Sequence, residues 1–512
     1  MLSGVLLGAA FLDPRLGILA WVAFVPLLMA LDEVTRGDRP NRAAWDTGYL
    51  FGFAFFLVSV HWIARLSDVA ITVPWLKYPA WVVGAAYLAL FPALASTLTV
   101  FLARRAGMTI AVTFVPAWLA IEAARASGEL GFPWFQPGYT QSAMVPVIQL
   151  ASLGSVTLVT AWVLFLNVLL WRTMVPRRDG EAGVGRGILA LATVLTVALP
   201  WLWGSRVLAT TPKPQGPRPT IALVQGNIAG EIKWSGRHQR EILDRFLSLS
   251  REAMGRTPRP ALVVWPETAT GSYLRRQLDQ AIEVARLAYD HRVGVFSGFA
   301  DYRIDSIGVT RYFNSAGIFY PTGEPGEIYA KRHLVPFGER MPFQWLFPQL
   351  GRIELGQAEW TPGRGSVLFP GSSGRMFERG LGGKFACLIC FESIFPDLSR
   401  DDVRLGARWL LNVTNDEWFG RSAAIGQHAA MSIFRAVENH VPLARCANTG
   451  LTMMVDAHGR VVGRLPLMQP AVLSRELPPP GPPTLYNRIG DWPAWMAWAM
   501  VGALLFPRRR RP

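Results

Sequence analysis

The chain has 512 residues, of which 51% are hydrophobic and only 17% are charged. This length exceeds one ordinary domain, and this balance argues against a wholly water-soluble fold. The net charge is +15, but the sequence has no basic stripe with interleaved aromatic residues, so no nucleic-acid partner is expected. The chain has three cysteines, Cys387, Cys390 and Cys446. Because this number is odd, no small disulfide framework is expected. At least one thiol should be free.

Apolar runs near bilayer length fill the first 206 residues and return near the end of the chain. They predict a transmembrane domain over residues 1–206 with about seven spans and a C-terminal transmembrane helix over 491–507. The first run lacks a basic start and a clear cleavage site, so we interpret it as a short span rather than a signal peptide. The eight runs are Met1–Leu12, Leu16–Leu31, Thr47–Ala64, Tyr78–Ala103, Ala106–Ile121, Leu130–Trp171, Gly187–Ser205 and Trp492–Phe506.

Arginines gather in alternate loops, which the positive-inside rule assigns to the cytoplasm. They are Arg36, Arg39, Arg42, Arg104, Arg105, Arg172, Arg177, Arg178, Arg186 and Arg508–Arg511. The opposite loops carry few basic residues (Arg15, Arg65, Lys77 and Arg125). The long segment between the last two spans lies on this opposite side. The pattern therefore predicts a multi-pass protein of the cell inner membrane with a large domain in the periplasm.

Residues 219–480 have a different hydrophobic pattern, in which short β-rich apolar runs alternate with amphipathic stretches. Helices are expected at Arg237–Met254, Tyr273–His291 and Ala423–Glu438. The proline-rich Glu476–Thr484 would lead the chain back to the membrane. This alternation predicts an α/β layer fold with strands buried between helices.

Three buried runs end in a reactive side chain: Glu267, Cys390 and Asp416. Strand ends in α/β sheets are where functional groups collect. Taken alone, a glutamate in this position is more often a helix cap or a turn carboxylate. A cysteine in an apolar strand is usually a small buried hydrophobe, which is the interpretation we give to Cys387 and Cys446.

Cys390 is the better nucleophile candidate. Cys387 and Cys390 are three residues apart, so on a strand they would point to opposite faces. Cys390 stands at the expected strand end, where the Phe391 N–H could act as an oxyanion donor. The CLIC string could also be half of a zinc or redox site, but no second pair follows at ligand spacing. No metal and no cofactor are expected.

Three motifs are similar to those of a known protein family: WPET at Trp265–Thr268, YAKRHLVPFGE at Tyr329–Glu339 and CLICFE at Cys387–Glu392. In this order they resemble the Glu, Lys and Cys motifs of the nitrilase superfamily. With the spans, Gly131–Trp134, Gln225–Trp234 and Asn415–Gly420 resemble the apolipoprotein N-acyltransferase family. The resemblance implies a nitrilase-like α-β-β-α sandwich catalytic domain over 219–480, inserted in a polytopic helical membrane domain.

The resemblance also implies a reaction. Cys390 would take an acyl chain from a phospholipid, phosphatidylethanolamine, as a thioester, with Glu267 as base and Lys331 stabilising the oxyanion. The acceptor would be the N-terminal amine of a diacylglyceryl-cysteine apolipoprotein, and the enzyme a monomer. Residues that would bind or support the substrates are Trp234, Glu339, Phe391, Glu392, Asn415 and Trp418. Phe391 departs from the family pattern, since many relatives have tyrosine there.

Two other functions stay open on the residues alone. A membrane-tethered amidase of the nitrilase type would pass its acyl group to water, although the apolar Met341–Leu350 suits a lid against lipid as well as ordinary core. A transporter would carry ionisable groups inside its spans, and only His61 stands clearly inside an apolar run.

Overall fold

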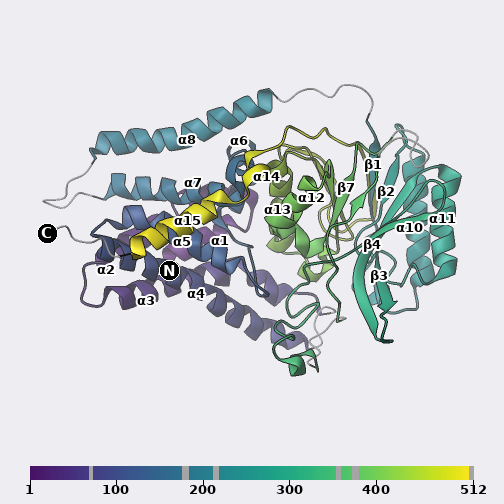
Figure 1. The fold of residues 1–512 in the computed structure, drawn as a ribbon, viewed down its shortest axis with the longest axis horizontal. Helices are drawn as coiled ribbons and strands as arrows, with labels where there is room; N and C mark the ends of the chain where they lie inside the picture. Colours follow the sequence, from purple (N-terminus) through teal and green to yellow (C-terminus); the bar gives the residue numbers. More distant parts are fainter. Residues whose placement is uncertain (69–72, 176–183, 211–217, 353–358, 372–379, 507–512) are drawn as a thin grey trace. The chain divides into compact units, whose positions relative to one another are not determined.

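The computed structural model describes residues 1–68, 73–175, 184–210, 218–352, 359–371 and 380–506. Arg177, Arg178 and Arg508–Arg511, used above for orientation, lie outside them. The chain divides into two compact units (Figure 1). The first comprises Met1–Arg65, Trp75–Thr211 and Thr484–Pro512, and the second comprises Leu66–Pro74 and Pro212–Pro483.

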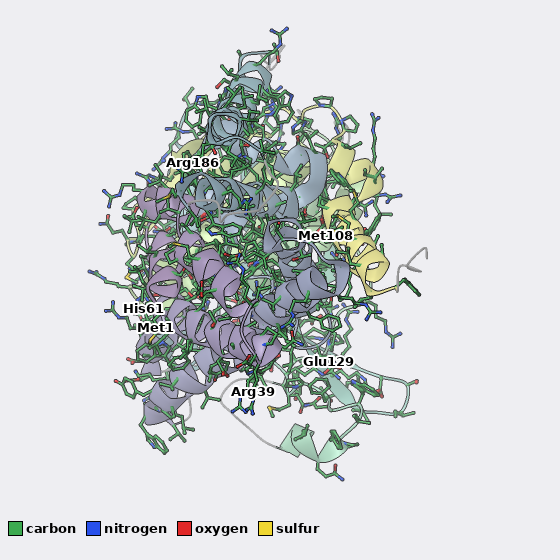
Figure 2. All side chains as sticks on the ribbon, turned by 90° about the vertical axis from the view of Figure 1, so that its left-hand side faces the viewer. Met1, Arg39, His61, Met108, Glu129 and Arg186 are labelled. Atoms are coloured by element: carbon green, nitrogen blue, oxygen red, sulfur yellow. The ribbon has the colours of Figure 1, made fainter. Side chains whose placement is uncertain are left out.

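The first unit is helical (Figure 2), and many large apolar side chains on its helices are exposed. Within the described residues, five helical stretches are long and apolar enough to cross a membrane: Pro14–Val34, Pro40–Arg65, Pro74–Ala106, Ala151–Met174 and Arg186–Ala209. The number of spans stays a prediction. The helices outside the second unit's fold are α1 (Leu2–Ala10), η1 (Pro14–Trp21), α2 (Val25–Val34), α3 (Pro40–Ser59), η2 (His61–Arg65), η4 (Pro74–Leu76), α4 (Lys77–Ala106), α5 (Ile110–Arg125), η5 (Pro137–Gln141), α6 (Val145–Ile148), α7 (Ala151–Met174), α8 (Arg186–Ala209), α14 (Leu485–Ile489) and α15 (Trp492–Leu505).

The run Leu130–Trp171 is not one continuous helix, contrary to its treatment as a single span. Pro133, Pro137 and Pro146 lie in its first half, where proline removes helical hydrogen bonds and the chain forms only η5 and α6. The helix of this run that is long and apolar enough to span is α7, which starts at Ala151.

α5 continues past Ile121, where the apolar run was expected to end, and buries two charged residues. Glu122 and Arg125 are 6% and 4% exposed, and their side chains approach to 3.6 Å. Arg125 Nη1 also donates to the carbonyl oxygens of Phe132 and Trp134, both at 2.6 Å. Assigning Arg125 to a loop was therefore wrong: it ends a helix and fastens the GFPW segment to it.

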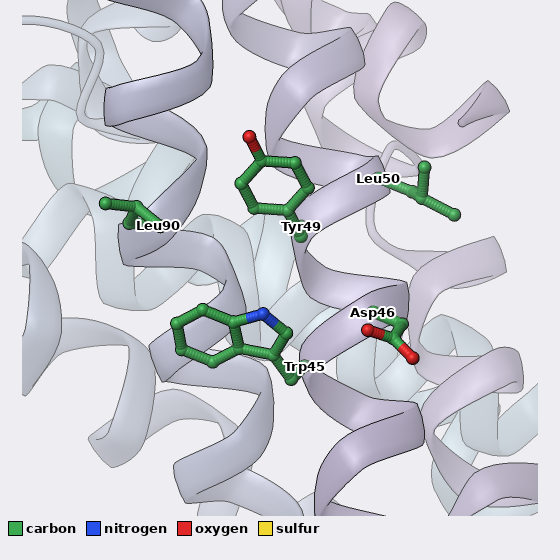
Figure 3. Close-up of a pocket in the computed structure, with 5 residues that line it drawn as sticks. All are labelled: Trp45, Asp46, Tyr49, Leu50 and Leu90. Atoms are coloured by element: carbon green, nitrogen blue, oxygen red, sulfur yellow. The ribbon is translucent and has the colours of Figure 1, made fainter.

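Between α3 and α4 the surface has a groove of about 410 Å³. Figure 3 shows Trp45, Asp46, Tyr49 and Leu50 on α3 and Leu90 on α4 around it. Its lining is mainly apolar, and Asp46 is exposed at its edge. The groove contains none of the residues that the motifs singled out.

The second unit contains, in the described residues, two six-stranded sheets that pack face to face. In each, three neighbouring strands run parallel and the flanking pairs are antiparallel. One sheet has the order β12 (Ala471–Glu476), β1 (Thr220–Gln225), β2 (Leu262–Val264), β3 (Gly294–Ile304), β4 (Thr310–Phe319), β5 (Pro325–Ala330). The other has the order β11 (Val461–Arg464), β10 (Met453–Val455), β9 (Leu443–Ala447), β8 (Trp409–Thr414), β7 (Phe385–Ile389), β6 (Leu368–Phe369).

Helices cover both outer faces of this pair of sheets (Figure 1). α10 (Gln239–Met254) and α11 (Leu278–His291) pack on the first sheet, and α12 (Pro396–Arg404) and α13 (Ala423–Asn439) pack on the second. Apolar clusters fill the space between the sheets and beneath the helices on each side. The predicted α-β-β-α sandwich is confirmed. Short helices α9 (Gly230–Lys233), η6 (Pro348–Arg352), η7 (Cys390–Ile394) and η8 (Asp416–Phe419) lie in its loops.

The buried pair in α5 yields a stability prediction. Arg125→Met should leave the Glu122 carboxylate without its cation in an apolar setting, which costs about 3–5 kcal/mol for buried pairs. The melting temperature of the full chain in detergent should fall, and Glu122→Gln together with Arg125→Met should recover part of the loss. Arg104→Met, at an exposed arginine of α4, is the matched control. An unchanged melting temperature for Arg125→Met would contradict this account.

Candidate active site

The motif residues meet where strands of both sheets end. Glu267 follows β2, Lys331 follows β5, Cys390 follows β7 and Asn415 follows β8. β2 runs parallel to both of its neighbours in one sheet, and β7 and β8 run parallel to each other in the other. The carboxyl ends of parallel strands share one edge of a sheet, so stacking the two sheets brings these side chains together.

Cys390 lies just beyond β7, as the first residue of η7. Its φ is +50°, a left-handed conformation that non-glycine residues seldom adopt and that is frequent at functional sites. Cys390 is partly exposed, whereas Cys387 and Cys446 are buried in the core between the sheets. The opposite-face argument for the two cysteines therefore does not apply. The end of the strand, and not the pleat, separates Cys390 from Cys387.

Lys331 lies between two carboxylates. Its Nζ is 2.8 Å from Glu339 Oε1 and 3.6 Å from Glu267 Oε1, and its side chain is 1% exposed. Burial by itself would lower the pKa of Lys331, but the charges of Glu339 and Glu267 outweigh it and raise that pKa. Lys331 is a permanent cation at neutral pH.

The Cys390 thiol is protonated in this resting site. Burial raises its pKa, the Glu267 charge raises it further, and Lys331 only partly opposes them. Lys331 lowers the thiol pKa less than burial and Glu267 raise it, because the ammonium also interacts with two carboxylates. A base must therefore remove the thiol proton during the reaction.

Glu267 is held at each of its oxygens. Asn314 Nδ2 donates to Oε1 at 2.7 Å, and the Asn415 N–H donates to Oε2 at 2.8 Å. Behind it, the buried Lys233 donates from Nζ to the Glu267 carbonyl oxygen at 3.2 Å. Burial lowers the pKa of Lys233 to about 8, with Glu267 and Glu417 opposing the shift. Asn415 thus contacts the glutamate through its backbone rather than its side chain.

Glu392 connects the lysine segment to the cysteine segment. Its Oε1 accepts hydrogen bonds from the Tyr329 hydroxyl at 2.7 Å and from the backbone N–H groups of Arg332 and His333 at 2.6 and 3.2 Å. Its Oε2 accepts from the Ile389 N–H at 2.7 Å. Burial raises the pKa of Glu392, while these donors oppose that shift. The carboxylate fixes the spacing between the ends of β5 and β7.

The predicted aromatic residues differ in their surroundings. Trp234 is 48% exposed and follows α9. Phe391 is buried against Phe395, with ring centroids 5.2 Å apart. Trp418 lies in η8 with its ring against Gly338, the neighbour of Glu339. Phe391 and Trp418 therefore shape the walls, and Trp234 is half-exposed, with the Lys233 ammonium 6.0 Å from its ring centroid.

Sequence reasoning missed two polar residues that contact Glu267. Asn314 stands in the middle of β4, where a buried amide inside an apolar strand was the available signal. Lys233 directly precedes Trp234, and a lysine beside an apolar run resembles a solvated surface residue. Their role depends on contacts between strands far apart in sequence.

The apolar stretch Met341–Leu350 is not ordinary core. Trp345, Leu346 and Phe347 are 69%, 53% and 53% exposed. Exposed aromatic and aliphatic side chains in one short segment suit contact with an apolar partner such as lipid.

Comparisons with known proteins identify the family of the chain. Residues 3–169 match the apolipoprotein N-acyltransferase N-terminal domain, and residues 220–480 match the carbon-nitrogen hydrolase family. An apolipoprotein N-acyltransferase of Geobacter metallireducens is 36% identical over 99% of this chain and 95% of its own length. The chain belongs to the apolipoprotein N-acyltransferase family. A relative of the same name from Chlorobaculum tepidum is 30% identical over 98% of this chain and 95% of its own length.

Among solved structures, an amidase from Nesterenkonia and Saccharomyces cerevisiae Nit3, a member of branch 10 of the nitrilase superfamily, are similar to the chain. The amidase is 18% identical, with a TM-score of 0.38 over 55% of this chain and 96% of its own. Nit3 is 19% identical, with a TM-score of 0.39 over 59% of this chain and all of its own. Membership of the apolipoprotein N-acyltransferase family makes this chain an acyltransferase of the carbon-nitrogen hydrolase superfamily.

The different positions of the two cysteines predict different reactivities. Iodoacetamide should alkylate the native chain at Cys390, and Cys390→Ser should abolish this labelling because the other two thiols are buried. Cys387→Ala should keep the labelling and lower stability modestly, through a small cavity between the sheets. Peptide mass mapping measures both. Labelling that persists in Cys390→Ser and disappears in Cys387→Ala would reverse the assignment.

Proposed function

We propose that this protein transfers an acyl chain from a phospholipid, through a thioester on Cys390, to the N-terminal amine of a diacylglyceryl-cysteine apolipoprotein. The observation that carries the proposal is the buried Lys331 ammonium between Glu267 and Glu339, beside a partly exposed cysteine. This arrangement provides a base, a cation and a nucleophile in one place. The chain's family is named for transfer to the nitrogen of an apolipoprotein.

In the first half of the reaction, Glu267 accepts the proton of the Cys390 thiol as Sγ attacks the ester carbonyl carbon. The charge that develops on the carbonyl oxygen is met by the Lys331 ammonium and by the Phe391 N–H. When the tetrahedral species collapses, the ester C–O bond breaks, and Glu267 returns its proton to the departing lysophospholipid oxygen. The site then holds a neutral thioester and a carboxylate.

In the second half, the neutral N-terminal amine of the lipoprotein attacks the thioester carbonyl. Glu267 takes a proton from the amine nitrogen, the C–S bond breaks, and the proton passes to Cys390 Sγ. The products are an N-acylated lipoprotein and the resting thiol. Glu339 holds Lys331 in place through both halves, and Glu392 holds the two segments that carry the lysine and the cysteine.

The finer assignments follow from chemistry. Phosphatidylethanolamine is the proposed donor, and the exposed Trp345, Leu346 and Phe347 would contact the acyl chains of the membrane. The same contact would keep water from the thioester, which favours transfer over the alternative, hydrolysis by a membrane-tethered amidase. A monomer suffices, since every proposed catalytic group belongs to one chain.

The direct test supplies the purified full chain with phosphatidylethanolamine and a synthetic diacylated lipopeptide. Mass spectrometry should find an acyl group on Cys390 with the phospholipid alone and an N-acylated lipopeptide after the peptide is added. Cys390→Ser is the control and should give neither product. Free fatty acid as the main product, with or without lipopeptide, would favour the amidase instead.

The contributions of the base and of the cation to thioester formation can be measured separately. Glu267→Gln keeps the side-chain shape but removes the proton acceptor, so thioester formation should fall by about 10²- to 10⁴-fold. Lys331→Met removes the cation that meets the oxyanion, which typically costs about 10²- to 10³-fold. Rapid-quench measurement of acyl-Cys390 reports both rates.

Lys331→Met also leaves two buried carboxylates without their shared cation. The double variant Lys331→Met with Glu339→Gln removes one of these charges and should restore stability but not the acylation rate. Recovery of the rate in the double variant would show that Lys331 acts only by neutralising Glu339, contrary to its proposed role.

We also propose that the protein lies in the inner membrane with its catalytic unit in the periplasm, as the arginine distribution indicates. Single cysteines at the exposed Ile307 and Asp38, in a Cys390→Ser background, should react oppositely with a membrane-impermeant maleimide in intact cells. Ile307→Cys should label and Asp38→Cys should not. Labelling of both positions, or of Asp38→Cys alone, would contradict this orientation.

A further inference from the structure

A buried histidine lies behind the nucleophile, and no step of the proposed reaction uses it. His428, on α13, is 1% exposed. Its Nε2 is 3.1 Å from the carbonyl oxygen of Cys390 and 3.1 Å from Ser393 Oγ, while Ser393 Oγ also donates to that carbonyl at 3.0 Å. Two side chains therefore converge on the main-chain oxygen of the nucleophile itself.

The other side of the imidazole faces a fixed ion pair. Nδ1 lies 3.0 Å from Asp416 Oδ1 and 3.0 Å from Arg445 Nη2. Arg445 Nη2 donates to Asp416 Oδ2 at 2.8 Å, and both of these side chains are fully buried. Burial would raise the pKa of Asp416, but Arg445 holds it well below its usual range. The carboxylate thus stays charged and fixes the guanidinium that holds the ring in one orientation.

The hydrogen on Nε2 follows from its neighbours. A ring protonated only on Nδ1 would turn a bare nitrogen lone pair toward the Cys390 carbonyl oxygen at 3.1 Å, which is repulsive. With its hydrogen on Nε2, the ring donates to that oxygen, and Nδ1 accepts from Arg445 Nη2, which also donates to the Asp416 Oδ1 that lies 3.0 Å from Nδ1. Burial, together with Arg445, lowers the pKa of His428, so the ring needs only this one hydrogen at neutral pH.

The Cys390 carbonyl belongs to the same planar peptide unit as the Phe391 N–H. In a trans peptide the C=O and N–H bonds point in opposite directions, so fixing one fixes the other. The Phe391 N–H lies in the first turn of η7, where N–H groups have no partner within the helix. A donor on the carbonyl also polarises the peptide and strengthens its N–H as a donor.

We infer that His428 is a positioning residue of the oxyanion hole. By donating from Nε2 to the Cys390 carbonyl, and held by Asp416 and Arg445, it aims the Phe391 N–H at the oxygen that becomes negative when Cys390 is acylated. The inference rests on the proposed function for the identity of the acyl donor, but the orientation of the peptide does not depend on that donor.

A metal site is the competing interpretation. Cys390, Asp416 and His428 each offer a ligand atom within 4.8 Å of the others. The Arg445 guanidinium already neutralises Asp416 and contacts the ring, so a divalent cation would meet a positive charge at close range. The three residues fit an orienting network better than a metal centre.

The test compares two reactions of Cys390 in the full chain. Acylation by a p-nitrophenyl ester develops an oxyanion, whereas alkylation by iodoacetamide does not. His428→Leu should lower the rate constant of the first p-nitrophenol turnover, which reports acylation, by about 10- to 10²-fold, less than the outright loss of a donor. The half-saturating ester concentration should be unchanged. The alkylation rate should stay within about threefold of wild type. His428→Gln, whose amide can donate to the same carbonyl, should recover most of the loss.

Two further variants guard against a folding artefact. Met431→Leu, a volume-conserving change at a buried residue of the same helix, should leave both rates unchanged. Ser393→Ala removes the second donor to the Cys390 carbonyl without disturbing a charge and should lower the acylation rate severalfold.

Equal losses of acylation and alkylation in His428→Leu, or wild-type acylation in both His428→Leu and Ser393→Ala, would overturn the inference. Failure of phosphatidylethanolamine to acylate a wild-type chain that still cleaves the p-nitrophenyl ester would instead count against the proposed function.

Discussion

The site depends on one buried ammonium group between two carboxylates. Without Lys331, Glu267 and Glu339 would hold two negative charges in a space that excludes water, and such charges repel strongly at low dielectric. Without the carboxylates, a lysine with 1% exposure would lose its proton. Each charge is therefore present because of the others, and together they lie beside a neutral thiol.

The sandwich maintains this balance because each charged side chain follows a strand that its neighbours hold in register. β2 and β5 belong to one sheet, and β7 and β8 belong to the other. The hydrogen bond from the Asn415 N–H, after β8, to Glu267, after β2, therefore joins the ion cluster to the second layer. Glu392 also joins the two layers by accepting from both the β5 and the β7 ends. Gly298, on β3, lies so close to Glu267 that a Cβ there would be 2.7 Å from the Glu267 Cα. Even the base's backbone position is thus fixed by a neighbouring strand.

Much of the fold and of the candidate site could be predicted from the sequence, because strands and motifs are formed by residues that are close together in the chain. The spacing of the apolar residues predicted the strands, and the order of the three motifs indicated the sandwich. The ends of amphipathic helices were less accurate: α11 begins at Leu278 and not Tyr273. Asn314, Lys233 and His428 could not be assigned, since each is defined by a contact with a residue at least 34 positions away. Likewise, the Arg125 contacts become visible only when α5 and the following loop are folded together.

The neutral resting thiol explains why base and nucleophile must act together. A cysteine that is already a thiolate reacts with oxidants and stray electrophiles, and susceptibility to oxidation follows thiolate character and exposure. Cys390 is partly exposed, and the compartment proposed for its unit is oxidising. Here burial and Glu267 keep the proton on sulfur until a carbonyl carbon is within reach to accept the electron pair. The negative charge then moves to an oxygen that faces Lys331 and the Phe391 N–H, so the site generates its nucleophile only together with the charge it is built to stabilise.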